Sequence, residues 1–384
     1  MSEHALFNFS SGPVQASNRT LRSLSKQVMF DYDPEFMNLF DETTEQLQRL
    51  FKTKNDVIIM QGEALLGLEA AAMCIIEPGD KCLNLVSGIY GHLYASYIEA
   101  YGGELIEVRT DYHNVIDPAD VEKAFKEHPD IKIMAVCHSE TPSGTLNPIQ
   151  DICPIAKKHG AITIVDSVSG IVSTELEVDK WGIDICCIGP QKNIACSPGL
   201  APVSVSDVAW EKMRNKSKPV RYSYMSMLDF KEIWLEKRTW PYTPFTNEVV
   251  ALNEALKQIF EEGLDNVIAR HKTAAKMARA GVRGMGLEIW PESDEICGSC
   301  ATAVKPPKGI DEVKLREHLY EKYKVIISGG LKDLKGKVFR VGHMGPASEP
   351  AMVVMQLAMI EKSLQELGYP VKLGSGVGAA LEVI

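Results

Sequence analysis

Short apolar segments rich in β-branched residues alternate with amphipathic segments between residues 57 and 205. The apolar segments predict strands at 57–60, 82–86, 104–108, 132–137, 161–166, 183–188 and 201–205. Between them, apolar residues at helical spacing predict helices at 66–76, 93–101, 118–127 and 149–159. Parallel neighbouring strands need a long crossover connection, which is usually a helix. We therefore expect an α/β fold whose large domain holds a mostly parallel, doubly wound sheet.

The alternation ends after the last of these strands. Residues 222–244 include several aromatic side chains and predict a loop region, and helices are expected at 247–262 and 264–285. Beyond Gly286 the pattern predicts a small α+β unit, with strands and helices at 301–304, 311–323, 325–327, 338–341 and 347–367. An amphipathic helix at 35–51 precedes the alternation. We expect a large domain, 1–285, that includes the N-terminal segment and the binding site, and a small C-terminal domain, 286–384.

Two charged residues follow neighbouring apolar segments. Asp166 ends the segment 161–166, and Lys192 follows the segment 183–188 after a break at Gly189-Pro190. Open α/β sheets bind ligands at the carboxyl ends of their strands, so both side chains are expected at one edge. A lysine that forms a Schiff base and an aspartate that keeps a pyridine nitrogen protonated are the groups that pyridoxal chemistry requires. Taken singly, each is more often a cap or a solvated surface group, but the pair favours a site.

Charge and hydropathy exclude several classes of protein. The net charge of −10 argues against a nucleic-acid interface, and no segment has the ~18 consecutive apolar residues of a membrane-spanning helix. The first residues show neither a basic nor an apolar region of a secretory signal, so we expect a cytoplasmic protein. No strand is followed by GxGxxG, which argues against a dinucleotide-dependent dehydrogenase.

The nine cysteines fit a reducing compartment, because most lie in apolar segments where a thiol acts as a small hydrophobic group. Cys297 and Cys300 form a single CxxC pair without a second pair or suitably spaced histidines. A structural zinc site needs four ligands, so we expect this pair to be structural and no metal to be bound.

Several short motifs resemble those of the class V aminotransferases of the pyridoxal-phosphate-dependent fold type I superfamily. Their order and spacing carry the resemblance, which covers nearly the whole chain: Ser11-Gly-Pro13, Gln61-Gly-Glu-Ala-Leu-Leu-Gly-Leu-Glu-Ala70, Ser87-Gly-Ile-Tyr-Gly91, Cys137-His-Ser-Glu-Thr-Pro-Ser-Gly144, Asp166-Ser-Val-Ser169, Gly189-Pro-Gln-Lys192 and Arg340-Val-Gly-His-Met-Gly345. The resemblance implies the fold type I architecture and a homodimer or homotetramer with active sites between subunits.

The resemblance also implies roles for individual residues. Lys192 would form the Schiff base and, once freed, move a proton between the amino donor and the ring, while Asp166 would pair with the pyridinium nitrogen. Tyr90 would stack on the ring face, although a half-exposed core tyrosine is an alternative. Thr141 would donate to the 3-oxygen of the ring, although a threonine after a strand is equally a cap.

Two further positions complete the implied site. Gln191, next to the lysine, would contact the bound vitamer. Arg340 would hold the carboxylate of the acceptor through two parallel hydrogen bonds, which arginine makes better than lysine; the alternative is a surface arginine.

Glu63 is the most informative position for substrate choice. In most of this class the corresponding turn is small and polar, and it binds the phosphate of pyridoxal phosphate. A carboxylate there would repel a phosphate by ~1 kcal/mol or more per pair of unit charges. The alternative is that Glu63 turns outward to cap the helix that follows. The residues Asp31-Tyr-Asp-Pro34, Gly62-Glu63, Thr141-Pro-Ser-Gly144 and Gly342-His-Met-Gly-Pro346 are similar to the pyridoxamine–pyruvate branch of the class.

That branch implies transfer of an amino group from pyridoxamine to pyruvate, a reaction of vitamin B6 degradation that gives pyridoxal and L-alanine. The vitamer would then be a covalently bound substrate and product. A conventional alanine– or serine–glyoxylate aminotransferase that uses pyridoxal 5′-phosphate is the alternative. One departure leaves the acceptor open: the branch has a further arginine in the loop before Arg340, where this chain has Leu331 followed by Lys332 and Lys335. Pyruvate, glyoxylate or a larger oxo acid could each be held by Arg340 alone.

Overall fold

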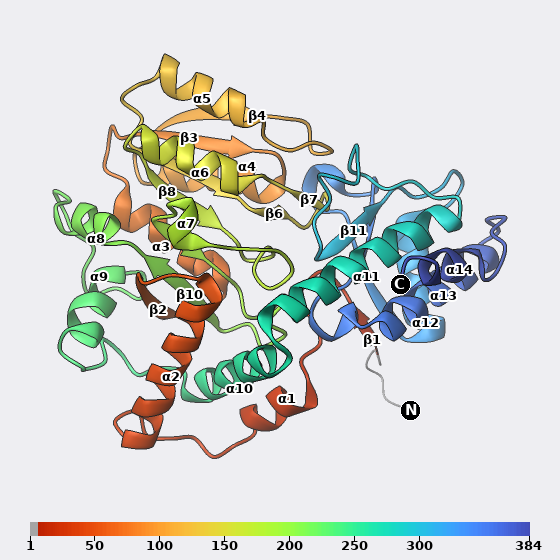
Figure 1. Cartoon of the computed structure of the whole chain (residues 1–384), viewed down its shortest axis with the longest axis horizontal. Coiled ribbons are helices and arrows are strands. Elements are labelled where there is room, and N and C mark those ends of the chain that lie inside the picture. Colours follow the sequence, from red (N-terminus) through yellow and green to blue (C-terminus); the bar gives the residue numbers. More distant parts are fainter. Residues whose placement is uncertain (1–6) are drawn as a thin grey trace.

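A computed structural model describes residues 7–384 of the chain (Figure 1). Residues 1–6, on which the expectation about a secretory signal rests, lie outside the described part. The large sheet has seven strands in the order β2-β10-β9-β8-β5-β3-β4. Their bounds are β2 Asp56–Gln61, β3 Lys81–Val86, β4 Glu104–Arg109, β5 Ile133–Cys137, β8 Ile162–Asp166, β9 Ile185–Cys187 and β10 Leu200–Val205. Only β10 runs against its neighbours, so the sheet is mostly parallel, as predicted.

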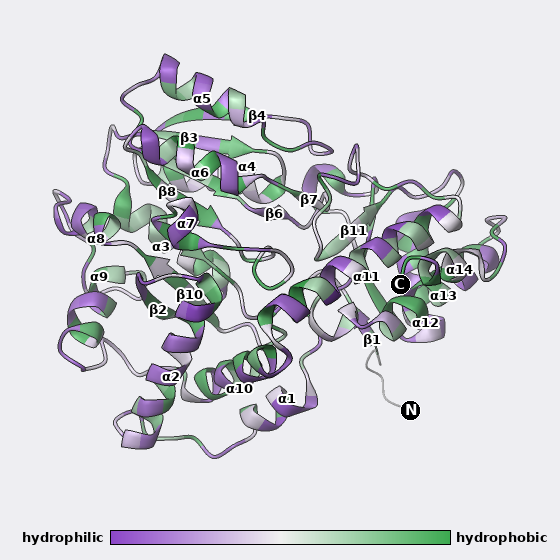
Figure 2. Ribbon diagram, viewed as in Figure 1, coloured by the Kyte–Doolittle hydropathy of each residue, from purple (hydrophilic) through white to green (hydrophobic). Residues whose placement is uncertain are grey.

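Helices cover both faces of this sheet (Figures 1 and 2). Adjacent strand residues alternate between two hydrophobic cores: Ile58 packs in one and Ile59 in the other, and Ile164 and Val165 divide in the same way. Helices α2, α5 and α6 contribute to one core, and α3, α4 and α8 to the other. The helices have the bounds α2 Pro34–Phe51, α3 Ala64–Ile75, α4 Ile89–Ala100, α5 Pro118–Glu127, α6 Ile149–Lys158, α7 Val178–Trp181 and α8 Asp207–Arg214. Helices on both faces confirm the predicted doubly wound architecture.

The prediction of an aromatic loop over 222–244 is wrong for part of the segment. A short α9 (Met227–Asp229) runs directly into a π-helical segment, η1 (Phe230–Leu235). The side chain of Ser226 accepts a hydrogen bond from the amide of Asp229 and so caps this helix, while Trp234 is buried and stacks on Trp240 at a ring distance of 3.6 Å. The segment is helical because its apolar side chains pack into the cores, which its aromatic composition alone did not indicate.

The C-terminal part forms a second, four-stranded sheet in the order β1-β12-β13-β11. Its elements are β1 Phe7–Phe9, β11 Ala301–Val304, α12 Glu312–Tyr323, β12 Val325–Gly329, η2 Lys332–Leu334, β13 Phe339–Gly342, η3 Gly345–Ser348, α13 Pro350–Glu366 and α14 Ser375–Leu381. The N-terminal strand β1 pairs with β12 in parallel, and α11 (Leu264–Gly284) packs against α13 and α14. Strand β1 and helix α11 therefore contribute to the C-terminal core, and the division into 1–285 and 286–384 stays a prediction.

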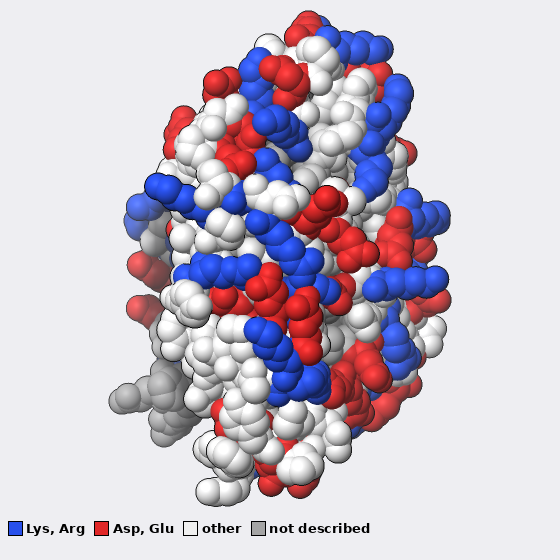
Figure 3. Space-filling view, turned by 90° about the vertical axis from the view of Figure 1, so that its left-hand side faces the viewer, with Lys and Arg blue, Asp and Glu red and all other residues white. Residues whose placement is uncertain are grey.

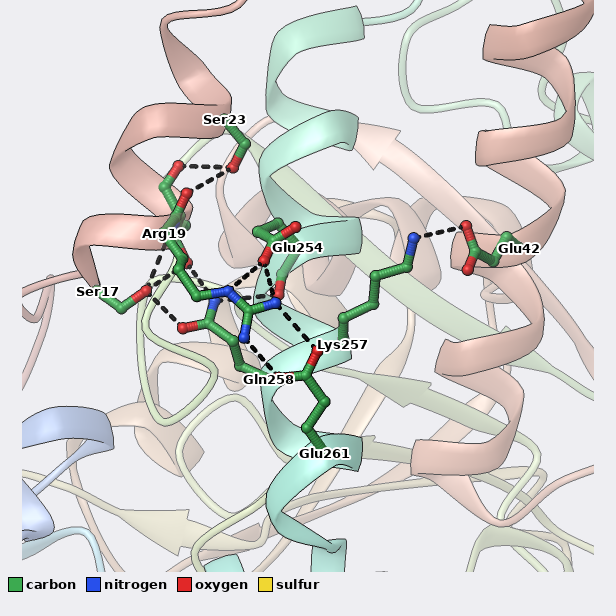
Figure 4. A network of polar contacts seen from close by, with 9 residues as sticks. Ser17, Arg19, Ser23, Glu42, Glu254, Lys257, Gln258 and Glu261 are labelled. Atoms are coloured by element: carbon green, nitrogen blue, oxygen red, sulfur yellow. Dashed lines mark hydrogen bonds and ion pairs between the residues drawn. The ribbon is translucent and has the colours of Figure 1, made fainter.

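Helix α1 (Asn18–Leu24) connects β1 to the large domain through a polar network with α10 (Thr246–Glu262). The guanidinium of Arg19 lies 2.6 Å from Glu254 and 2.5 Å from Glu261. Figure 4 shows it between these two carboxylates of α10. On the face drawn in Figure 3, basic and acidic side chains are interspersed and no large patch of one sign appears. Within residues 7–384, no helix is both long and apolar enough to cross a membrane.

Candidate active site

The carboxyl ends of β8 and β9 bring Asp166 and Lys192 to one cavity. Asp166 is the last residue of β8 and lies opposite Cys187, the last residue of β9. A turn follows in which the amide of Lys192 donates to the carbonyl of Gly189 at 3.2 Å. The cavity above these strand ends is lined by Gly12, Pro13, Glu63, Ala64, Leu65, Leu68, Tyr90, Ser139, Asp166, Val168, Ser169, Gln191, Lys192 and Pro198.

Lys192 is packed tightly, with only 9% of its surface exposed. Its Nζ donates to the carbonyl of Ser11 at 2.6 Å. A Cβ at Gly12 would lie only 2.4 Å from Cδ of Lys192, so a residue with a side chain would clash with the lysine at this position. The φ of Gly12, +106°, also favours glycine. Burial lowers the pKa of Lys192 and the charge of Arg340 lowers it further, against the opposing effect of Asp166. A lowered pKa raises the fraction of the lysine that is the neutral, nucleophilic amine near neutral pH.

Asp166 is the acid of the site. One of its carboxylate oxygens accepts the amide of Val168 at 3.0 Å. Burial raises the pKa of Asp166 to about 6, and the nearby charge of Glu63 adds to this effect while Lys192 opposes it. A buried carboxylate of this kind is stabilised by any cation placed beside it, and a protonated pyridine nitrogen is such a cation. The amine and the acid together fit a pyridoxal compound.

Tyr90 lies in the first turn of α4 and lines the cavity, where burial raises its pKa to about 12. Thr141 is fully buried and does not line the cavity, but its hydroxyl lies 3.5 Å from that of Ser169, which does. The structure therefore places the predicted stacking residue at the cavity, and the predicted hydroxyl donor in contact with a residue that lines it.

Glu63 is the N-cap residue of α3, but its side chain makes no capping hydrogen bond. The carboxylate instead lines the cavity and lies 3.4 Å from Nε2 of Gln191. Gln191 is only 5% exposed, and its Oε1 has no hydrogen-bond partner among the described residues. The cavity thus has the carboxylate of Glu63 at the end where α3 begins, whereas the unpaired Oε1 of Gln191 is occluded and lies towards Gly189. The alternative of Glu63 as a helix cap finds no hydrogen bond to support it.

Arg340 lies on β13, between β12 and β11 in the small sheet, and its charge lowers the pKa of Lys192. Its Nε donates to the carbonyl of Gly329 at 2.9 Å, which leaves both terminal nitrogens able to donate to a carboxylate. Burial lowers the pKa of Arg340 to about 10, and Tyr90 makes the largest contribution that opposes this shift. Arg340 does not line the cavity itself, and Leu331, in the loop before it, is 40% exposed.

Three residues near the cavity were not predicted as part of the site. Ser139 lines the cavity, and its hydroxyl lies 3.4 Å from the thiol of Cys300, which is fully buried. Glu140 is also fully buried and accepts the amide of Tyr90 at 3.1 Å. Ser139 and Glu140 could have been found from their place directly after the strand 133–137, within the motif 137–144. The sequence predicts a structural role for Cys300 and gives no sign that it lies beside Ser139. Cys297, the other half of the CxxC pair, is half-buried, and all nine cysteines are free.

Comparison with known proteins adds the family. The profile of the family described as Aminotransferase class-V matches residues 13–345. The chain is 38% identical to the pyridoxamine–pyruvate transaminase of Mesorhizobium japonicum, over all of this chain and 98% of the relative. It is 30% identical to the (S)-ureidoglycine–glyoxylate transaminase of Bacillus subtilis, over 97% of this chain and 94% of the relative. The crystal structure of the pyridoxamine–pyruvate aminotransferase from Mesorhizobium loti superposes with a TM-score of 0.96 at 38% identity, covering 99% of this chain and 97% of that one.

Proposed function

The chain belongs to the class V aminotransferase family and is a transaminase with the fold type I architecture, and on that premise we propose that it transfers the amino group of pyridoxamine to pyruvate. The products are pyridoxal and L-alanine. The vitamer is then a substrate that binds and leaves in each cycle, and the pyridine ring supplies the electron-withdrawing group that makes the transfer feasible.

The observation that carries this proposal is the position of Glu63. Its carboxylate faces the cavity without capping α3, at the helix N-terminus where a phosphate would otherwise bind. A phosphate would meet this negative charge and would have to displace the carboxylate from the nearby amide of Gln191. A neutral hydroxymethyl group avoids both the repulsion and the displacement, and it could donate a hydrogen bond to the carboxylate of Glu63.

The remaining side chains fit the same substrates. Lys192, held by Ser11, supplies the amine that bonds to the vitamer and moves a proton, and Asp166 keeps the ring nitrogen protonated. Tyr90 packs on the ring face. Arg340 binds the carboxylate of the oxo acid through its two terminal nitrogens. Thr141 donates towards the 3-oxygen of the ring, which requires its hydroxyl to turn from Ser169 to the cavity.

The assembly we propose is a cytoplasmic homodimer or homotetramer. Several large apolar side chains are exposed on the single chain, including Val28 at 67%, Phe30 at 69% and Tyr222 at 95%. Exposed groups of this kind are typical of interfaces between subunits. Light scattering on the purified protein would give the mass of the assembly.

A phosphate-dependent glyoxylate aminotransferase is the second candidate, and it has its own support. The 30% identical relative from Bacillus subtilis is a glyoxylate transaminase, and the loop before Arg340 carries Leu331 with two lysines nearby. This candidate requires Glu63 to leave the cavity, because pyridoxal 5′-phosphate would place its phosphate there.

Mass spectrometry of the small molecules released when the purified protein is denatured separates the two candidates. The proposal predicts that any B6 compound released lacks phosphate and is lost from the native protein on dialysis. One equivalent of pyridoxal 5′-phosphate per chain that survives dialysis would favour the glyoxylate enzyme. Rates with pyruvate and with glyoxylate as acceptors, measured on the same preparation, then identify the oxo acid.

A further inference from the structure

One fully buried carboxylate takes no part in the proposed reaction, that of Glu140, which bonds to the cavity residue Tyr90. This inference rests on the proposed function. We propose that Glu140 is a positioning residue, which fixes Tyr90 and the turn that begins at Thr141 so that both can contact the vitamer.

The carboxylate of Glu140 binds the first turn of α4. Its Oε1 accepts the amide of Gly91 at 2.6 Å and its Oε2 accepts the amide of Tyr90 at 3.1 Å. The first amides of a helix have no partner within the helix, and the N-cap residue of α4 is Gly88, which has no side chain to offer. Glu140, about fifty positions later in the chain, therefore caps the N-terminus of α4.

The space for this carboxylate depends on a glycine. A Cβ at Gly88 would lie 2.3 Å from Cδ of Glu140, and one at Gly91 would lie 3.4 Å from its Oε1. Glu140 is 0% exposed, and burial raises its pKa to about 7 while the two amide hydrogen bonds oppose that rise. The fit between Glu140 and the turn at 88–91 is close enough that a shift of one requires a shift of the other.

The backbone of Glu140 holds a second loop. Its carbonyl accepts the amide of Gly144 at 2.8 Å and the hydroxyl of Ser143 at 3.3 Å, which closes the turn over 141–144. Glu140 also pairs with Thr145 in the two-stranded ladder of β6 (Ser139–Glu140) and β7 (Thr145–Leu146). One buried residue thus connects the turn that carries Tyr90 to the turn that carries Thr141.

The consequence for the site is geometric. Tyr90 is the second residue of α4, so the direction of its ring follows the direction of this first turn. Replacing Glu140 with glutamine keeps the shape but sets an amide NH₂ against one of two backbone N–H donors, so one buried donor loses its partner. A lost hydrogen bond to a charged group corresponds to roughly a tenfold to hundredfold change in affinity.

A double-mutant cycle on vitamer binding tests the inference. The dissociation constant for pyridoxal is measured by absorbance titration of wild type, Glu140→Gln, Tyr90→Ala and the double variant. We expect Glu140→Gln to weaken binding about tenfold or more, and the double variant to bind within about twofold of Tyr90→Ala. If the dissociation constant of the double variant instead rises by the product of the two single-variant factors, Glu140 does not act through Tyr90 and the inference is wrong.

Hydrogen exchange on the vitamer-free protein gives an independent readout. Glu140→Gln should speed exchange at the amides of Tyr90 and Gly91, whereas Glu99→Gln, an exposed change at the other end of α4, should not. Unchanged exchange in Glu140→Gln would overturn the inference. If Glu140→Gln does not fold, Glu140→Asp, whose shorter side chain reaches fewer of these donors, takes its place. Wild type that binds no vitamer would refute the proposed function alone, because the exchange measurement needs no ligand.

Discussion

Replacing Glu63 with glutamine is expected to abolish most of the discrimination against phosphorylated vitamers. The change keeps the size of the side chain and its place at the start of α3, but removes its charge. A phosphate monoester carries about −1.5 to −2 charges at neutral pH. Glu63 is exposed in the single chain, so the water value of ~1 kcal/mol per pair of unit charges at ~4 Å applies. The repulsion is then about 1.5–2 kcal/mol, roughly tenfold to thirtyfold in affinity.

The assay is a steady-state comparison of kcat/KM for pyridoxamine and pyridoxamine 5′-phosphate. Wild type should prefer the free vitamer by about tenfold or more, and Glu63→Gln should bring the ratio near one. Raising the ionic strength should narrow the preference of wild type but not that of the variant, because salt screens exposed charges. Glu63→Ser should go further and favour the phosphate, since serine also frees the amides at the start of α3.

Glu99→Gln is the matched control, because it removes one exposed negative charge from the same domain away from the cavity. Its ratio of kcat/KM values should equal that of wild type. An unchanged ratio in Glu63→Gln, or a wild type that uses both vitamers equally well, would refute the electrostatic reasoning and leave Glu63 without a role in substrate choice.

Three other substitutions test the assigned roles. Lys192→Ala should abolish turnover and leave thermal unfolding nearly unchanged, because the amine acts in the chemistry; turnover near the wild-type rate would remove Lys192 from the site. Arg340→Lys should raise KM for the oxo acid by roughly tenfold to a hundredfold with little effect on KM for pyridoxamine, since a bidentate pair is lost; equal effects on both substrates would contradict this role. Asp166→Asn should lose activity yet stabilise the vitamer-free protein above about pH 6. Burial raises the pKa of Asp166 from 3.8 to about 6, so the native chain binds more protons than the unfolded chain between these values. The unfolding free energy of wild type should therefore fall by up to about 3 kcal/mol as pH rises through this window, whereas that of Asp166→Asn should not show this fall. Denaturant titrations at about pH 5 and about pH 8 cover the upper part of this window, so wild type should lose roughly half of that amount between them; equal pH dependence in the two proteins would contradict the prediction.

The sequence was sufficient for the large sheet because its strands are buried on both faces. A strand such as β8 is fully buried along its length, so it reads as an unbroken apolar run that ends at a charged residue. The same logic placed Asp166 and Lys192 at one edge. It did not reveal that β10 runs antiparallel to both neighbours, because the direction of a strand leaves no mark on its hydropathy.

Contacts between segments that are distant in the chain could not be predicted either, because they too leave no mark on the hydropathy pattern. Strand β1 has three residues and joins the C-terminal sheet beside β12, more than three hundred positions away. Glu140 and Cys300 contact the cavity residues Tyr90 and Ser139, and these are contacts that only the folded chain defines. Thr141, one residue beyond Glu140, is buried and reaches the cavity only through Ser169, so its role towards the vitamer stays a prediction. Periodicity predicts which face of an element is buried, but not which loop covers a cavity.

Counting the pyridoxal formed per protein chain tests the central proposal most directly. Dialysed protein is mixed with excess pyridoxamine and pyruvate, without added pyridoxal 5′-phosphate, and pyridoxal and L-alanine are quantified over time. If the vitamer is a substrate, both products accumulate in equal amounts to many equivalents per chain. If pyridoxal stops at or below one equivalent per chain while added pyridoxal 5′-phosphate restores transfer between amino and oxo acids, the vitamer is a resident cofactor and the proposal is wrong.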